Sequence, residues 1–116
     1  MDRIDIILNQ ELEVRLEIAS NKKTQQKVLK ALAKDKFESV RARVGKNLNT
    51  NIHTLKELST DEHFMVRGAV GLNPKVEISL LKVLSSDNYD YVREKVVENP
   101  RCPLDIIRKL STDPHW

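Results

Sequence analysis

The segment that decides the fold is DEHFMVRGAVGLNP, residues 61–74. Its Val-Arg pair occurs four times, and each copy begins 26 residues after the one before it, at Val14, Val40, Val66 and Val92. An asparagine follows each arginine of these pairs by six residues, at Asn21, Asn47, Asn73 and Asn99. A period of roughly 20 to 50 residues is typical of stacked-repeat proteins. The sequence therefore predicts a row of similar units packed on one another.

Each unit is expected to contain two helices of roughly three turns. Val66 and Val70 are four residues apart and share one face of a first helix. This helix is expected to end at the repeated asparagine, in a left-handed turn that asparagine tolerates. A second helix is expected to begin near Thr24, Thr50, Val76 and Pro103. Stacking is then expected to bury one row of side chains: Val14, Ile18, Val40, Val44, Val66, Val70, Val92 and Val96.

The predicted fold is an all-α, right-handed α-solenoid that forms a single domain over residues 1–116. It has four repeats of two helices, at about residues 10–35, 36–61, 62–87 and 88–113. A leading half-repeat over residues 2–9 aligns with the second helix of the later units, so that Ile6 falls in the row of Leu32. Residues 113–116 match the opening of another first helix.

The frame of aspartate, Val-Arg, asparagine and a leucine-rich second helix resembles the HEAT-like repeats, in particular the leucine-rich repeat variant family. The resemblance covers residues 2–116 and implies the right-handed superhelix of helix pairs. Some members of that family hold an iron–sulfur cluster through several cysteines. This chain has only Cys102, so we expect no such cofactor.

Composition and spacing argue against catalysis and membrane insertion. No apolar run approaches the ~20 residues that span a bilayer, and the N-terminus lacks the order of a signal peptide. His53, His63 and His115 are dispersed, and none has a second ligand at metal-binding spacing. We expect a non-enzymatic, soluble, cytoplasmic protein with no metal, cofactor, membrane partner or small-molecule substrate.

The repeated arginines allow two interpretations. A row of guanidinium groups can grip phosphates. Alternatively, each arginine pairs with the aspartate six residues before it and braces the stack, and we favour this structural ladder. Its expected pairs are Asp35 with Arg41, Asp61 with Arg67, and Asp87 with Arg93, and the asparagines Asn47, Asn73 and Asn99 are expected to satisfy backbone groups at the turns.

A second basic row is the candidate binding surface. One basic residue recurs in each second helix, just after a core residue, so it is expected to point outward. Residues 21–56 also hold ten basic and two acidic residues. The row consists of Lys30, Lys56, Lys82 and Arg108, extended by Lys23 and Lys27.

Three functions are compatible with this row, and solvated lysines on an ordinary helix surface are the simpler alternative. The first is an adaptor that binds a protein partner. The second is nucleic-acid binding through residues 22–46 with Lys56, Lys82 and Arg108, although no stacking aromatics are interleaved there. The third is a structural segment of a larger repeat protein. Aromatic residues at the start of the first helices are either interface anchors or fillers between repeats: Phe37, Phe64, Tyr89, Tyr91 and Trp116.

Overall fold

A computed structural model describes residues 2–112, and over this range the chain is all helical, with nine α-helices and no strand. The prediction of an all-α chain is confirmed. The molecule is elongated, with dimensions of 52 × 21 × 18 Å. The helices are α1 (Arg3–Leu8), α2 (Leu12–Ser20), α3 (Gln26–Leu32), α4 (Glu38–Lys46), α5 (Ile52–Leu58), α6 (Phe64–Leu72), α7 (Ile78–Leu84), α8 (Asp90–Glu98) and α9 (Leu104–Ser111).

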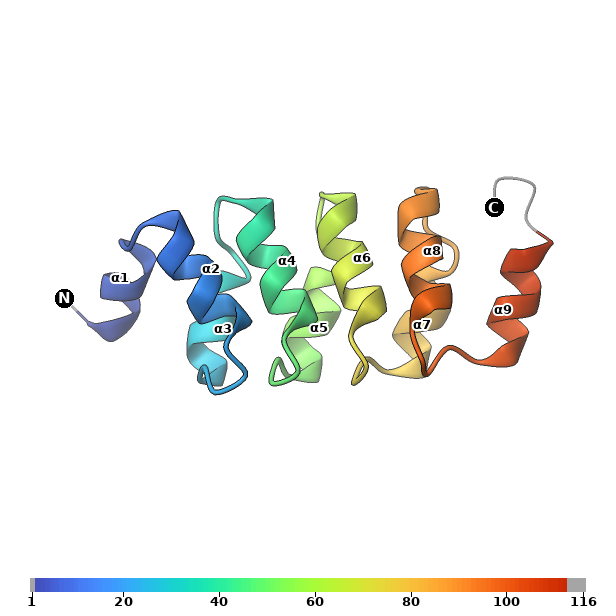
Figure 1. Cartoon of the computed structure of the whole chain (residues 1–116), viewed down its shortest axis with the longest axis horizontal. Coiled ribbons are helices and arrows are strands. Elements are labelled where there is room, and N and C mark those ends of the chain that lie inside the picture. Colours follow the sequence, from blue (N-terminus) through green and yellow to red (C-terminus); the bar gives the residue numbers. More distant parts are fainter. Residues whose placement is uncertain (1, 113–116) are drawn as a thin grey trace.

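The helices form two rows along the long axis (Figure 1). We call α2, α4, α6 and α8 the A row, in which each helix packs directly on the next. We call α1, α3, α5, α7 and α9 the B row. Helices α3, α5 and α7 each contact the A-row helices on both sides. The A row is therefore the continuous layer of the molecule, and the B row covers one side of it.

The A-row helices have nine residues, but α3, α5 and α7 have only seven, so the expected three turns per helix were wrong for the B row. The threonines explain part of the difference. The hydroxyl groups of Thr24 and Thr50 donate to the carbonyl groups of Ile18 and Val44, at the end of the preceding helix. These residues belong to the turn, and the B helices begin two residues after them.

The predicted left-handed turn at the asparagines was also wrong. Asn47 has φ −66° and ψ 126°, which is extended backbone, and no residue between 2 and 112 has a positive φ. The side chain of Asn47 directs the turn instead, because its Oδ1 accepts from the backbone N–H of Asn49 at 2.8 Å. This local bond closes the loop between the two helices of a repeat.

The core lies between the two rows and is aliphatic. Six of the eight predicted core residues of the A row are fully buried: Val40, Val44, Val66, Val70, Val92 and Val96. The other two were predicted wrongly, since Val14 is 37 % exposed and Ile18 is half-buried. Helix α2 is the first of the A row, so no preceding A-row helix covers its valine. Ile6 of α1 is likewise exposed, in contrast to the fully buried Leu32.

Candidate functional site

The arginines of α2, α4 and α6 each form an ion pair with the aspartate that lies just before the next A-row helix. The Nε atoms of Arg15, Arg41 and Arg67 lie 2.7–2.8 Å from carboxylate oxygens of Asp35, Asp61 and Asp87, each 20 residues later. The predicted pairing with the aspartate six residues earlier was therefore wrong. The aspartate six residues earlier hydrogen-bonds to the arginine through its backbone carbonyl group instead, as Asp35 O accepts from Nη1 of Arg41 at 2.7 Å.

Local geometry explains why the carboxylates turn towards the preceding A-row helix. Each one accepts the backbone N–H of the residue two positions later, as Asp87 does from Tyr89 at 3.0 Å. This bond fixes the carboxylate at the start of the A-row helix. Its oxygens then face the arginine of the preceding A-row helix, and Asp87 accepts from both Nε and Nη2 of Arg67.

The ion pairs shift the ionisation of their members. The hydrogen bond to Asp61 raises the pKa of Arg41, and the bond to Asp87 raises that of Arg67. Burial of Asp87 disfavours its charged form, but the hydrogen bonds from Arg67 and Tyr89 outweigh it, so the pKa of Asp87 lies below its ordinary value. Nε, Nη1 and Nη2 of Arg67 all donate within the protein. These arginines brace the stack and have few donors left for phosphate.

The asparagines form hydrogen bonds between neighbouring repeats. The Nδ2 atom of Asn73 donates to the carbonyl groups of Gly45 and Asn47, at 2.8 and 3.0 Å. Asn47 and Asn99 make the equivalent pairs of bonds with the repeat before them. All three side chains belong to residues that are at most 4 % exposed. The expectation that they satisfy backbone groups holds, and their partners include the preceding repeat.

The aromatic residues lie at the junctions between repeats. The ring of Phe64 stacks on His63 and on Tyr89, with centroid distances of 4.9 and 5.0 Å. The guanidinium group of Arg67 lies 5.4 Å from the Tyr89 centroid. These contacts favour junction filling over free interface anchors, and they include His63, which sequence analysis did not assign. Trp116 lies outside the described residues.

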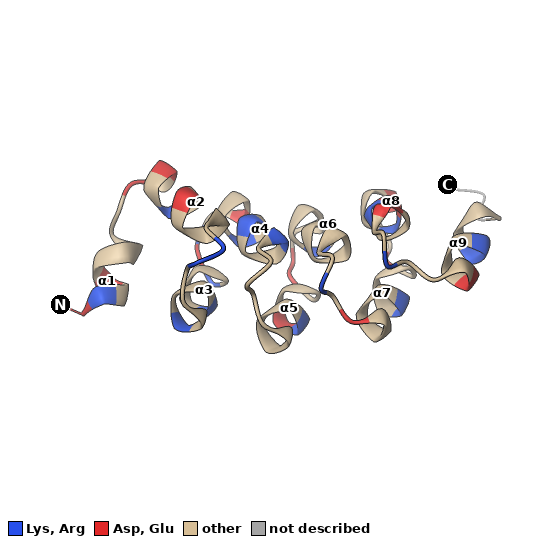
Figure 2. Cartoon of the chain, turned by 60° about the horizontal axis from the view of Figure 1, so that its bottom comes forward, with Lys and Arg blue, Asp and Glu red and all other residues tan. Residues whose placement is uncertain are grey.

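The predicted basic row follows the B-row helices, several of which carry blue segments in Figure 2, although Lys23 lies in the loop before α3. Its six members are exposed, and within residues 2–112 none of them takes part in an ion pair: Lys23, Lys27, Lys30, Lys56, Lys82 and Arg108. Four of them recur once per B helix, on α3, α5, α7 and α9. They are among the charges that the ion pairs between A-row helices do not use, in contrast to the ladder arginines.

Exposed apolar side chains accompany this basic row. Ile52, Val83 and Leu104 are 50 %, 64 % and 59 % exposed. A furrow of about 190 Å³ lies between α5 and α7, lined by Ile52, His53, Lys56, Glu77, Ser79 and Leu80. Sequence analysis missed the furrow. Of its apolar lining residues, Ile52 belongs to a repeating apolar position of the sequence, which recurs at Ile78 and Leu104.

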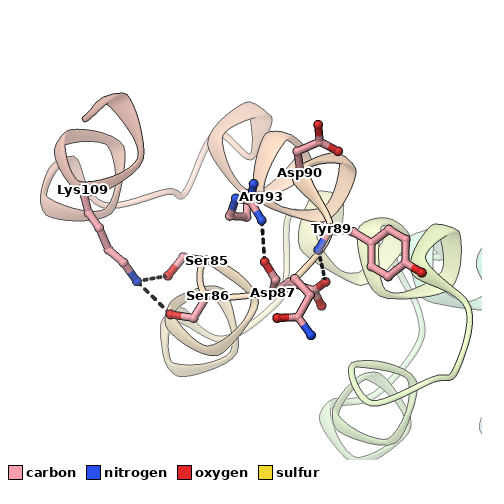
Figure 3. A pocket seen from close by; sticks show the side chains of 8 residues that line it. Ser85, Ser86, Asp87, Tyr89, Asp90, Arg93 and Lys109 are labelled. Carbon is pink, nitrogen blue, oxygen red and sulfur yellow. Dashed lines mark hydrogen bonds between the residues drawn. The ribbon is translucent and has the colours of Figure 1, made fainter. Parts of the chain in front are cut away.

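A larger hollow of about 640 Å³ lies beside α8 and α9 (Figure 3). Its polar groups bond to one another, since Nζ of Lys109 donates to the hydroxyl groups of Ser85 and Ser86 at 3.2 and 2.9 Å. In the earlier repeats, the aspartate 20 residues after the ladder arginine pairs with that arginine. Its counterpart here, Asp113, lies outside the described residues, so we assign no ligand to this hollow.

Comparison with models of protein families, with curated proteins and with solved structures finds no match for this chain. Residues 2–112 contain no cluster of three or more histidine, cysteine or acidic side chains placed to hold a metal ion. Within the same range, every helix is too short or too polar to cross a membrane. The arguments for function therefore come from the surfaces described above.

Proposed function

We propose that this protein is a non-enzymatic adaptor of the cytoplasm, a right-handed HEAT-like or leucine-rich-repeat-variant solenoid that binds a protein partner through its B row. The handedness follows from the resemblance of the repeat frame. One observation carries the binding proposal. An exposed basic side chain that forms no ion pair within residues 2–112 recurs once per B helix, at Lys30, Lys56, Lys82 and Arg108, and three of the most exposed apolar side chains lie on the same row of helices. We call the exposed side chains of α3, α5, α7 and α9 the B-row surface.

The B-row surface favours an acidic protein segment that also carries apolar side chains. Carboxylates of the segment pair with Lys30, Lys56 and Lys82, and an apolar side chain enters the furrow beside Ile52. Nucleic acid fits the lysines but leaves the apolar groups exposed. It also finds no stacking platform there, because the aromatic rings lie at the starts of α4, α6 and α8. Nucleic-acid binding is therefore the second candidate.

The spacing of the basic row adds a sequence requirement for the partner. Neighbouring helices pack about 10 Å apart, so the basic residues recur at about that distance. A segment in the extended polyproline II conformation advances about 3.1 Å per residue with three residues per turn, so every third residue faces the same side and recurs about every 9 Å, close to the spacing of the lysines. We expect an extended segment with an acidic residue at every third position.

A fluorescence polarisation titration tests both candidates. The probes are a labelled peptide with aspartate at every third position and leucine between, a peptide of the same composition in scrambled order, and generic single- and double-stranded DNA and RNA. Each is titrated at low and moderate salt. We expect the ordered peptide to bind more tightly than the other probes.

Two triple variants give the matched comparison. Replacing Lys30, Lys56 and Lys82 with alanine is expected to weaken peptide binding at least about tenfold. Replacing three exposed lysines outside the B helices, Lys22, Lys36 and Lys75, removes the same charge and is expected to have little effect. Tighter binding of a nucleic acid, or equal losses in the two variants, contradicts the proposal.

A further inference from the structure

The A row is uncovered at its first helix. Within residues 2–112 no A-row helix precedes α2, and in Figure 2 α2 begins the upper row of helices while α1 begins the lower row. A hollow of about 470 Å³ lies at this end of the stack, between α1 and the C-terminal end of α2. We call it the end hollow. Its lining includes Ile6, Ile7, Ile18, Asn21 and Thr24.

The next repeat shows what covers such a surface. The residues 26 positions after these five are at most 5 % exposed: Leu32, Ala33, Val44, Asn47 and Thr50. An A-row helix, α2, precedes them and packs on both α3 and α4. The end hollow is therefore the place that the preceding A-row helix occupies in the other repeats. We call a helix bound there the docked helix.

Asn21 sets the direction of the docked helix. Asn47 and Asn73 each use Nδ2 to donate to two carbonyl groups at the end of the preceding A-row helix and just after it. Within residues 2–112, the side chain of Asn21 makes one bond, in which Oδ1 accepts from the backbone N–H of Lys23. Its Nδ2 can therefore donate to the last carbonyl groups of a docked helix. Arg3 and Lys23 also line the hollow and favour this end, because a helix C-terminus carries a partial negative charge.

The close approach of the A-row helices sets the size of one residue. A small residue holds the same position near the ends of α2, α4 and α6, as Ala19, Gly45 and Gly71. A Cβ added to Gly45 would lie 3.2 Å from the Cβ of Ala69 and 3.5 Å from a methyl carbon of Val70. A docked helix that packs on α2 in the same way therefore needs glycine or alanine at this position.

Glu17 sets the charge of the docked helix. Its equivalent in the next repeat is Arg43, whose Nη1 donates at 2.8 Å to the hydroxyl group of Ser20 on the preceding helix. Glu17 is exposed and thus faces the docked residue that directly follows the small one. Glu13, one turn earlier on α2, is also exposed. A basic residue after the small one, as Lys46 follows the glycine of α4, therefore pairs with Glu17.

We propose that the end hollow and the uncovered face of α2 form a docking site for a short helix of a partner protein, which continues the A row. The docked helix runs parallel to α2, carries glycine or alanine followed by lysine or arginine near its C-terminal end, and places its last carbonyl groups at Asn21. A second copy of this chain does not fit. Its last described A-row helix, α8, has Val97 in place of the small residue and Glu98 in place of the basic one. The site is additional to the B-row surface of α3, α5, α7 and α9.

The sequence of α4 supplies a probe, because Gly45 followed by Lys46 meets both requirements. A synthetic peptide of residues 36–49 with blocked termini is titrated into the ¹⁵N-labelled protein and followed by NMR. The peptide must become helical on binding, so a Kd on the order of 1 mM is expected, and the titration extends to about 5 mM. The side-chain amide signal of Asn21, identified by its absence in the variant Asn21→Ala, is expected to shift as the peptide binds.

Variants of the protein and of the peptide test the two contacts separately. Glu17→Lys in the protein is expected to weaken binding at least about threefold, and Lys46→Glu in the peptide is expected to restore it. Glu94→Lys makes the same change of charge at an exposed residue of α8 and is expected to have little effect. Gly45→Val in the peptide is expected to abolish detectable binding through the close approach, although valine has the higher helix propensity.

Circular dichroism confirms that the protein variants fold. The proposal is overturned by an unchanged Asn21 signal at about 5 mM peptide, by equal losses in Glu17→Lys and Glu94→Lys, or by failure of the exchanged pair to restore binding. Undiminished binding of the Gly45→Val peptide overturns it as well. A shift of the Asn21 signal with protein concentration in the absence of peptide assigns the site to a second copy and is equally contrary to the proposal.

Discussion

Replacing Asn73 with alanine is expected to lower the free energy of unfolding by more than the loss of its one hydrogen bond within the repeat would. The side chain of Asn73 makes three hydrogen bonds and belongs to a residue that is only 1 % exposed. Its Nδ2 atom donates two bonds, to the carbonyl groups of Gly45 and Asn47 in the preceding repeat. Its Oδ1 atom accepts the third, from the backbone N–H of Lys75 at 2.9 Å. Alanine removes the side chain and therefore all three bonds at once, and leaves their backbone partners in place.

The magnitude follows from these bonds. A typical intramolecular hydrogen bond contributes about 1 kcal/mol net, and an acceptor left buried without a partner costs about 1–3 kcal/mol. Loss of three bonds, with two carbonyl groups stranded between repeats, gives an expected loss of about 3 kcal/mol in the free energy of unfolding. Domains are typically stable by only about 5–15 kcal/mol, so this loss is large.

Asn21 provides the matched control within the same chain. It occupies the same position of the first repeat and is exposed, and no earlier A-row helix supplies carbonyl groups to it. Its side chain accepts one bond, from the backbone N–H of Lys23 at 2.9 Å. Asn21→Ala is therefore expected to cost less than about 1 kcal/mol.

Urea unfolding followed by circular dichroism measures both variants. We expect equal slopes of free energy against urea, and a midpoint that falls much further for Asn73→Ala than for Asn21→Ala. Equal losses in the two variants would refute the reasoning, because they would show that the bonds between repeats add nothing to the local turn.

Three further perturbations test the packing and the ion pairs by thermal and urea unfolding. Gly71→Ala is expected to stabilise the protein by about 0.5–1 kcal/mol through helix propensity, because the added Cβ makes ordinary contacts, the nearest at 3.4 Å. Gly68→Ala is not expected to show this gain, because its Cβ would lie 2.5 Å from a tyrosine ring carbon of α8. Val66→Ala is expected to cost about 2 kcal/mol, and Val14→Ala less than about 1 kcal/mol, because only the first is fully buried. The lowered pKa of Asp87 contributes stability that is present above its unfolded pKa of about 4 and is lost as the pH falls through the folded value, so Asp87→Asn is expected to flatten the acid side of the stability curve.

The repeat period predicted the helix pairs and most of the core, but it did not predict the partners in the ladder. Asp35 lies six residues before Arg41 and 20 residues after Arg15, and the two spacings together make one period of 26. Every copy of the frame therefore offers both pairings equally. The choice depends on how the carboxylate is turned by its bond to the backbone of Phe37, which no spacing encodes.

The repeat period also predicts the same burial for equivalent residues in every copy, whereas within residues 2–112 the residues of the first copy lack a preceding A-row helix to cover them. Val14 and Val66 occupy the same position of the repeat, yet one is 37 % exposed and the other fully buried. For the candidate site, the position of the lysines in the repeat, one residue after a core residue, was enough to predict that they are exposed. The furrow beside Ile52 was not predictable, because it depends on the B helices packing against the A row more closely than against one another.

The positions that repeat and those that vary have separate roles on the B-row surface. The recurring basic residue supplies the same charge in every unit. It therefore contributes affinity for an acidic segment but does not favour either orientation of that segment along the B row. The position three residues before it changes from Lys27 through His53 and Ser79 to Asp105. This series runs from basic to acidic along the molecule, while the ladder charges beneath it are neutralised in pairs. An acidic segment laid along the B row therefore has lower electrostatic energy in one direction than in the other, with its more acidic end over α3. Selectivity on this scaffold then rests on the varying positions, which the packing of the stack leaves free to differ.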